Sequence, residues 1–132
     1  MKKMLTIKSE IDTKSSIIGN SIELDKLWTI LLENAIKYSN ENGEIIIVSK
    51  QDKKNVQVKI SDTGVGIDSV DLPHIFDRFY RADTSRTKTG KEGYGLGLAI
   101  AKKIVESHGA KVEVNSKIGK GTIFKLTFRK AN

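Results

Sequence analysis

The sequence contains the stretch Gly93-Tyr94-Gly95-Leu96-Gly97-Leu98, in which glycine recurs at every second position. An apolar segment, residues 99–105, follows it directly. Glycines permit positive φ angles and a close approach of a ligand to the backbone, and the first turn of a helix leaves N–H groups without intrahelical partners. The helix dipole adds roughly half a positive charge at the same place. The stretch therefore predicts a phosphate-binding helix start, although a tight turn explains these residues equally well when they are taken alone.

Length and composition indicate one soluble domain. A chain of 132 residues suits a single domain with one core. Cysteine is absent, which excludes disulfides and thiolate metal sites. No apolar run approaches the ~20 residues of a membrane span, and the apolar residues near the start are too few for a signal peptide. We therefore expect residues 1–132 to form one domain.

The net charge of +7 is compatible with an anionic ligand. Lysines and acidic residues alternate along most of the chain, so nucleic acid is not an expected partner. One basic cluster stands out in a polar stretch without periodicity, residues 77–92, and it comprises Arg78, Arg81, Arg86, Lys88 and Lys91. A solvated surface loop and a basic flap that closes over phosphates are both consistent with this cluster.

Hydrophobic periodicity predicts the order of the elements. The expected helices are a long one with Ser21 as its N-cap, which ends by residues 40–43, a short one over 69–76, and a second long one over 96–107. The expected strands are an edge strand over 4–10, a hairpin of 44–50 and 56–62, and a closing hairpin of 111–115 and 122–128 around the connection 116–121.

Two further segments suggest parts of a ligand site. Asn34, Lys37 and Tyr38 share one face of the first long helix, where an amide oxygen suits Mg²⁺ and a lysine suits phosphate. An ordinary exposed face explains these three residues as well. Asp62 ends a strand and is followed by Thr63-Gly64-Val65-Gly66, so its carboxylate could accept a hydrogen bond from the amino group of adenine while the glycines admit a flat ring. A simple turn cap is the alternative.

Four segments together resemble the conserved boxes of the bacterial sensor histidine kinases. They match in order and spacing across roughly residues 20–128, and such an ordered set is far more specific than any single box. The N box is matched by Leu31-Leu32-Glu33-Asn34-Ala35-Ile36-Lys37-Tyr38-Ser39, the first glycine box by Asp62-Thr63-Gly64-Val65-Gly66-Ile67, the F box by Ile75-Phe76-Asp77-Arg78-Phe79-Tyr80-Arg81-Ala82-Asp83, and the second glycine box by residues 93–98.

This resemblance implies the Bergerat fold, a two-layer α/β sandwich in which a mixed sheet of about five strands carries three helices on one face, with a flexible ATP lid. It also implies binding of ATP and Mg²⁺ and transfer of the γ-phosphate to a histidine on the dimerisation domain of the parent kinase, in two-component signal transduction. A response regulator would be the indirect partner. We expect the domain to be a monomer on the cytoplasmic side of a parent anchored in the bacterial membrane.

Carried onto this sequence, the resemblance assigns Asn34 to Mg²⁺, Lys37 to phosphate and Asp62 to the adenine amino group. Arg78 or Arg81 would be available to the γ-phosphate, so both join Asn34 and Lys37 as catalytic candidates. Phe76 and Phe79 are expected to pack within the lid. The other expected nucleotide-binding residues border the base or the phosphates, and they are Tyr38, Gly64, Gly66, Ile67, Gly93, Tyr94, Gly95, Leu96, Gly97, Leu98 and Thr122.

Departures from the family pattern shape the expected activity. Ile30 stands where the related ATPases have a water-activating glutamate, which argues against efficient ATP hydrolysis. Nothing resembles the phosphoacceptor hairpin, and His74 and His108 lie inside matched elements, so we expect the catalytic domain without that hairpin. Two alternatives stay open: an anti-sigma-type protein-serine kinase, and a conformational ATPase of the gyrase or mismatch-repair type.

Overall fold

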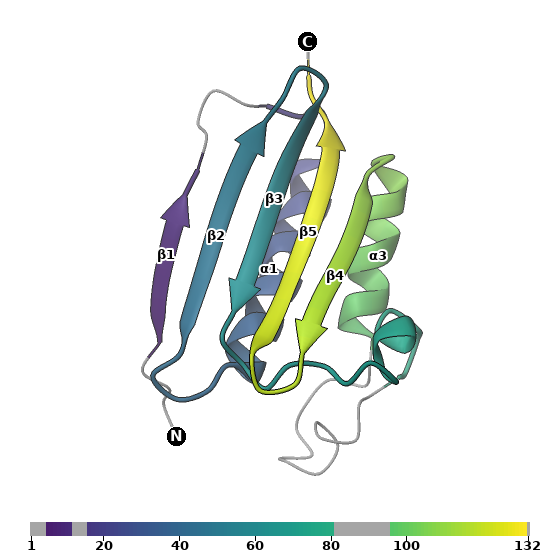
Figure 1. Ribbon diagram of the computed structural model, residues 1–132. Helices are drawn as coiled ribbons and strands as arrows, with labels where there is room; N and C mark the ends of the chain where they lie inside the picture. The colour runs from purple at the N-terminus through teal and green to yellow at the C-terminus, as the bar shows by residue number, and fades with distance from the viewer. Residues whose placement is uncertain (1–4, 12–15, 81–95, 132) are drawn as a thin grey trace.

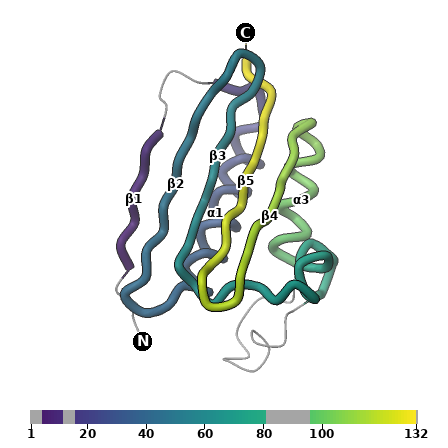
Figure 2. The backbone as a smooth tube through the Cα atoms, in the orientation of Figure 1, coloured from purple at the N-terminus to yellow at the C-terminus, as the bar shows by residue number. Residues whose placement is uncertain are grey.

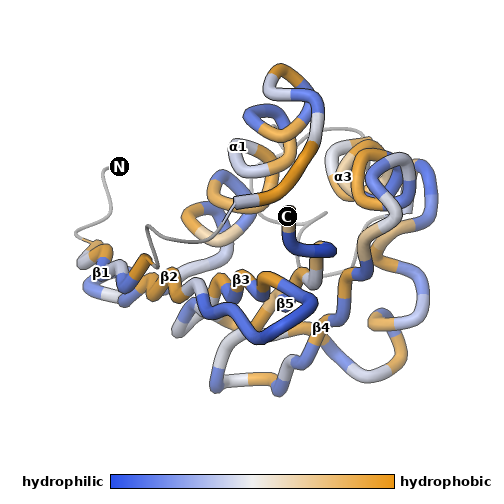
Figure 3. Tube along the Cα trace, turned by 90° about the horizontal axis from the view of Figure 1, so that it is seen from above, coloured by the Kyte–Doolittle hydropathy of each residue, from blue (hydrophilic) through white to orange (hydrophobic). Residues whose placement is uncertain are grey.

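The computed structural model describes residues 5–11, 16–80 and 96–131, and it has two layers (Figure 1). One layer is a five-stranded sheet in the order β1-β2-β3-β5-β4. The other consists of the helices α1 and α3, which cover one face of the sheet (Figure 3). The expected mixed-sheet α/β sandwich is thus confirmed. The helix count differs from the expected three, because the described residues form two α-helices and one short 3₁₀ helix, η1.

All the expected strands are present. β1 runs parallel to β2, and every other neighbouring pair is antiparallel. The hairpin between β4 and β5 is tighter than expected, since Gly119 adopts φ 80° at its tip and pairing continues to Lys117 and Gly121. The strand bounds are β1 (Thr6–Glu10), β2 (Glu44–Gln51), β3 (Asn55–Asp62), β4 (Lys111–Lys117) and β5 (Gly121–Arg129).

The two α-helices present apolar stripes to the sheet. α1 (Ser21–Tyr38) buries Leu27, Leu31 and Ala35, and α3 (Gly97–Ser107) buries its own stripe. The N-cap of α1 is Asn20, so the expectation of Ser21 was wrong by one residue. The Asn20 side-chain oxygen accepts a hydrogen bond from the Glu23 N–H at 3.0 Å, which satisfies a donor of the first turn.

The helix expected over residues 69–76 is absent from the described chain, which instead has η1 (Leu72–His74). Asp68 starts a turn that does not continue as an α-helix. Its side-chain oxygen accepts the Val70 N–H at 2.9 Å, and its carbonyl oxygen accepts the Asp71 and Leu72 N–H groups at 2.9 and 3.1 Å. Pro73 has no N–H to form the next α-helical bond, and the chain continues as the short 3₁₀ helix η1.

The core lies between the two layers. Trp28 on α1 stacks at a tilt on Phe128 of β5, with ring centroids 5.8 Å apart. The buried residues of the core cluster come from both helices, from three strands and from Ile75, and they are Leu27, Leu31, Ala35, Ile45, Ile60, Ile75, Ala101, Ile104, Val105, Phe124, Leu126 and Phe128. None of the helices in the described residues is long and apolar enough to cross a membrane.

After β3 the chain crosses the end of the sheet, beneath the β4–β5 hairpin, and reaches η1 (Figure 2). The Gly119 N–H donates to the Val65 carbonyl oxygen at 2.9 Å, so this crossing is bonded to the hairpin tip. The same end of the sheet receives the C-terminus of α1, because the Val65 N–H donates to the Tyr38 carbonyl oxygen at 3.1 Å. Three segments that are distant in sequence therefore meet here.

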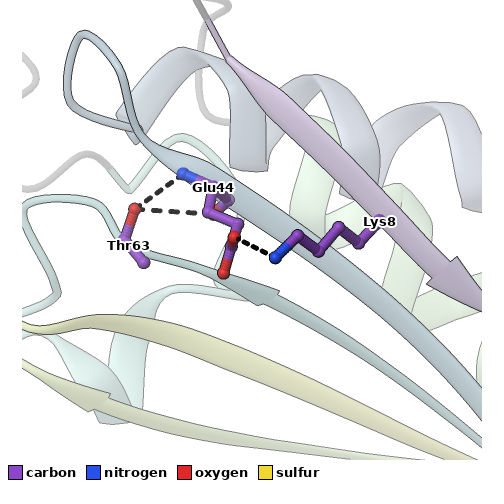
Figure 4. A network of polar contacts seen from close by, with 3 residues as sticks. All are labelled: Lys8, Glu44 and Thr63. Carbon is purple, nitrogen blue, oxygen red and sulfur yellow. Dashed lines mark hydrogen bonds and ion pairs between the residues drawn. The ribbon is translucent and has the colours of Figure 1, made fainter.

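Thr63 ties the end of β3 to the start of β2 (Figure 4). Its hydroxyl oxygen accepts the Glu44 N–H at 2.8 Å, and its own N–H donates to the Glu44 carbonyl oxygen at 3.1 Å. The Glu44 carboxylate forms a 2.9 Å ion pair with the largely exposed Lys8 on β1, which adds little to stability. The bonds of Thr63 hold the chain in place where it turns after Asp62.

Candidate functional site

Asp62, at the carboxyl end of β3, is a buried acid in the middle of the sheet. It is 7% exposed and lies opposite Ile45 on one side and Thr122 on the other. Burial raises the pKa of its carboxyl group, and hydrogen bonds from the backbone N–H groups of Gly64 and Thr122 partly oppose this rise. A carboxylate can accept about four hydrogen bonds, so these two donors leave room for a donor from a ligand.

Gly64 is packed so closely by its neighbours that a residue with a side chain does not fit at this position. A Cβ at this position would overlap the Tyr38 carbonyl oxygen and come within 2.7 Å of an Asp62 carboxylate oxygen. Gly64 also forms an isolated antiparallel bridge with Ser39, and its N–H donates to Asp62 at 2.8 Å. The first glycine box is therefore packed against the end of α1, which brings the C-terminus of that helix next to Asp62.

Two more glycines close the same region. Gly66 has φ 79°, and a Cβ there would overlap the Lys117 carbonyl oxygen of β4. Gly121 has φ 119°, and a Cβ there would overlap the Asp62 carbonyl oxygen of β3. Both positions combine a left-handed backbone with close packing, so only glycine suits them.

Ser116 joins the first glycine box to Thr122. Its hydroxyl oxygen accepts the Ile67 N–H at 2.7 Å, lies 3.0 Å from the Gly121 carbonyl oxygen, and is 2.8 Å from the Thr122 hydroxyl oxygen. Our sequence analysis missed Ser116, because it assigned this residue to a turn. The signal that could have found it is Gly119, since placing this glycine at the hairpin tip pairs Ser116 with Thr122.

The polar face of α1 carries the expected phosphate and metal residues. Asn34 is partly exposed and Lys37 is exposed. The Lys37 ammonium lies over the Tyr38 ring, 5.1 Å from its centroid, in a cation–π contact at the C-terminal end of the helix. In the described part of the chain, no three His, Cys, Asp or Glu side chains gather as a metal site.

The start of α3 lies beside this face. A Cβ on Gly97 would meet the Ile30 side chain at 3.6 Å, and Ile30 is one turn before Asn34 on α1. Among the described residues no side chain caps α3 at Leu96, whereas α1 has its Asn20 cap. The first N–H groups of a helix are donors that suit an anion. Leu96 and Leu98 are both partly buried, and Leu98 packs against the core.

The F-box residues divide into packed and exposed ones. Phe76 meets the core residue Phe124 edge-on at 6.3 Å, and the Lys102 ammonium lies 5.7 Å from the Phe76 ring centroid. Phe79 is 65% exposed with φ 66°, and Arg78 is exposed. Arg81, Gly93, Tyr94 and Gly95 lie outside the described residues.

Residues 19–132 match the model of the family of histidine kinase-, DNA gyrase B- and HSP90-like ATPases. The chain belongs to this family, as the sandwich fold and the arrangement around Asp62 indicate. The sensor protein CiaH of Streptococcus pneumoniae is 43% identical over 111 residues, which are 84% of this chain and 25% of CiaH. The signal transduction histidine-protein kinase ArlS of Staphylococcus epidermidis is 43% identical over 109 residues, which are 83% of this chain and 24% of ArlS.

The resemblance to the sensor kinases is thereby confirmed. The chain spans about a quarter of the length of these curated relatives. Among solved structures, the mycobacterial sensor histidine kinase MprB superposes with a TM-score of 0.84 at 27% identity, over 96% of this chain and 84% of the MprB chain.

Proposed function

We propose that this chain binds Mg-ATP and transfers the γ-phosphate to a histidine on the dimerisation domain of a sensor kinase, in two-component signal transduction. The observation that carries the proposal is the buried Asp62 carboxylate, whose bonds to two backbone N–H groups leave acceptor capacity at the bottom of a glycine-lined site. Burying a charge is costly, so a carboxylate kept here despite that cost needs a role.

The base would bind at Asp62, whose carboxylate accepts a hydrogen bond from the exocyclic amino group of adenine. Gly64 and Gly66 supply the flat, close-packed backbone against which a ring can lie, and Ile67 and Thr122 border it. Tyr38 contributes its carbonyl oxygen to the framework, and its ring stands beside Lys37. The Asp62 carboxylate suits the exocyclic amino group of adenine, and the close-packed backbone suits its flat ring.

The phosphates would extend toward α1 and the start of α3. Lys37 and the first N–H groups of α3, at Leu96, Gly97 and Leu98, supply positive charge and donors. Arg78 and Arg81 complete this set in the proposal, together with Gly93, Tyr94 and Gly95. Asn34 would hold Mg²⁺ through its amide oxygen, and the ion, when bound, neutralises charge that develops on the phosphates.

The transfer itself needs positioning and charge neutralisation more than covalent chemistry from the protein. A histidine nitrogen forms the new bond to the γ-phosphorus while the bond between that phosphorus and the bridging oxygen of ADP breaks, and ADP leaves with that bond's electron pair. The acceptor histidine comes from the dimerisation domain, and the phosphate passes on to a response regulator.

The side chain at position 30 favours transfer over hydrolysis. Ile30 is apolar, packs against the core, and lies near the start of α3, one turn before Asn34. An isoleucine cannot activate water, so the proposed domain holds ATP for a protein acceptor. The proposal places the domain, as a monomer, on the cytoplasmic side of a parent kinase anchored in the membrane.

The test is a phosphotransfer assay with the purified chain, γ-labelled ATP and the dimerisation domain of the parent kinase. The expected product is a label on that domain that acid removes and base preserves, as for phosphohistidine. The matched control is the same acceptor with its histidine replaced by glutamine, which should stay unlabelled. An acid-stable label would indicate a serine kinase, and rapid ATP hydrolysis without acceptor would indicate a conformational ATPase. Either result contradicts the proposal.

A further inference from the structure

Ser116 makes three hydrogen-bonding contacts but carries one proton. Its hydroxyl oxygen accepts the Ile67 N–H at 2.7 Å, and it lies 3.0 Å from the Gly121 carbonyl oxygen and 2.8 Å from the Thr122 hydroxyl oxygen. The Gly121 carbonyl can only accept, so the Ser116 proton goes there. The Ile67 N–H fills one lone pair of Ser116, and the other lone pair is left for Thr122.

These contacts also fix where the Thr122 hydroxyl donates its proton. For the contact between the two hydroxyls to be a hydrogen bond, Thr122 must donate to Ser116, which leaves Thr122 with lone pairs alone for any ligand. Thr122 is 6% exposed and pairs across the ladder with Asp62, whose carboxylate is itself an acceptor. Two neighbouring buried groups thus present acceptors on the same face of the sheet.

We propose that Ser116 is a positioning residue that locks the Thr122 hydroxyl as an acceptor, and that this lock makes the site select a 6-amino purine over a 6-oxo purine. The inference rests on the proposed function and deepens it. An amino group can donate to acceptors at this place, whereas a 6-oxo group brings a further acceptor against them. Without the Ser116 hydroxyl, Thr122 is released to donate to the oxo group.

The experiment compares ATP with inosine triphosphate, which carries a 6-oxo group in place of the amino group. Both nucleotides are titrated by calorimetry into the same preparation of the full chain, so a reduced folded fraction affects them equally. We expect Ser116→Ala to lower the ratio of the two affinities by roughly tenfold. Ser116→Thr keeps the hydroxyl and should restore the wild-type ratio.

Two further variants sharpen the test. Ser61 precedes Asp62 on β3, so its side chain lies on the other face of the sheet. Ser61→Ala removes that hydroxyl and should leave the ratio of the two affinities unchanged. Thr122→Val leaves the bond between Ser116 and Ile67 intact and should lower the ratio as Ser116→Ala does, with no further loss when the two are combined. This variant tests the inference even if Ser116→Ala does not fold.

The outcomes separate the two proposals. A wild-type chain that does not bind ATP overturns the proposed function and this inference together. A wild-type chain that prefers ATP, with the same ratio in Thr122→Val and in any folded Ser116→Ala, overturns this inference and leaves the proposed function standing.

Discussion

The candidate site has two ends that are built in opposite ways: the end around Asp62, where we propose that the base binds (the base end), and the end at α1 and the start of α3, where we propose that the phosphates bind (the phosphate end). At the base end, Gly64, Gly66 and Gly121 each lie where a Cβ would overlap a carbonyl oxygen, and Asp62 and Thr122 are buried. At the phosphate end, a Cβ on Gly97 would find ordinary contact at 3.6 Å. A side chain on any of these three glycines would clash with the backbone, whereas a side chain at Gly97 would not.

The polar groups of the two ends also differ, because those of the base end are buried and held by the backbone and those of the phosphate end are more exposed. The Asp62 carboxylate and the Ser116 hydroxyl are held by backbone N–H groups that come from two separate segments of the chain, the first glycine box and β5. The phosphate end offers the partly exposed Asn34, the exposed Lys37 and the uncapped start of α3. The difference teaches that, in the proposed site, discrimination of the base would depend on the closely packed residues around Asp62, while the phosphates would be held by groups that are accessible from solvent.

The largest effect is expected from Gly64→Ala. The new Cβ would overlap the Tyr38 carbonyl oxygen and approach the Asp62 carboxylate, so the end of α1 must move away from β3. We expect a loss of about 3 kcal/mol or more in the free energy of unfolding, measured by urea denaturation, and loss of ATP binding. A variant with the wild-type urea midpoint would show that the floor is less tightly packed than the structure indicates.

Asp62→Asn should weaken ATP binding by about 1.5–3 kcal/mol, since it removes a charged acceptor, and calorimetry measures the change. The same substitution should stabilise the ligand-free chain at neutral pH, because it removes a buried charge. Burial holds the pKa of Asp62 above its ordinary value of 3.8, so protonation favours the folded state. That stability is present below pH 3.8 and is lost as the pH rises through the folded-state pKa.

Asparagine carries no charge at any pH. The difference in the free energy of unfolding between Asp62→Asn and wild type should therefore be smallest in acid and should shift in favour of the variant as the pH rises. Urea denaturation at a series of pH values measures this difference. A variant that becomes less stable relative to wild type with rising pH would mean that the Asp62 carboxylate stabilises the folded chain. Its burial would then be no argument for a ligand at the base end.

Asn34→Ala tests the phosphate end at its proposed metal ligand. We expect the gain in ATP affinity that Mg²⁺ brings to fall by about tenfold, or 1.4 kcal/mol, while affinity measured with a chelator stays near the wild-type value. Glu33→Ala, at the exposed neighbouring position on α1, is the matched control and should keep the Mg²⁺ dependence. If Asn34→Ala kept it as well, Asn34 would not be the ligand.

The smallest effect is expected from Gly97→Ala. Among the described residues the added methyl group meets only the Ile30 side chain, and alanine is the better helix former, so the free energy of unfolding should rise by less than about 1 kcal/mol. Urea denaturation run beside Gly64→Ala provides the comparison. A destabilisation as large as that of Gly64→Ala would remove the proposed difference between the two ends.

Much of this arrangement could be predicted from the sequence, because the boxes are local patterns. The residues 62–67 and 31–39 carry their glycines, carboxylate and amide in a recognisable order, and hydrophobic periodicity set the strands to within a few residues. The resemblance to the sensor kinases that these boxes carry implied the fold class. The predicted roles of the site residues remain predictions for binding experiments to test.

The rest depends on contacts between distant segments. Ser116 acts across a hairpin whose tip had to be placed at Gly119, and our longer connection hid the pair with Thr122. The Tyr38 carbonyl oxygen, which explains Gly64, is a backbone atom that no side-chain pattern reveals. One miss has a local cause: η1 replaced the expected helix because Pro73 has no N–H for the bond that would extend the turn begun at Asp68, which periodicity does not show.

The most direct test of the central claim is a calorimetric titration of ATP into the purified chain, with and without Mg²⁺. The account predicts micromolar binding, roughly 7–8 kcal/mol, that Mg²⁺ strengthens. Circular dichroism of the same sample establishes that the chain is folded. A folded chain that takes up no ATP at millimolar concentration would contradict the claim that the buried carboxylate and its glycines form an adenine nucleotide site.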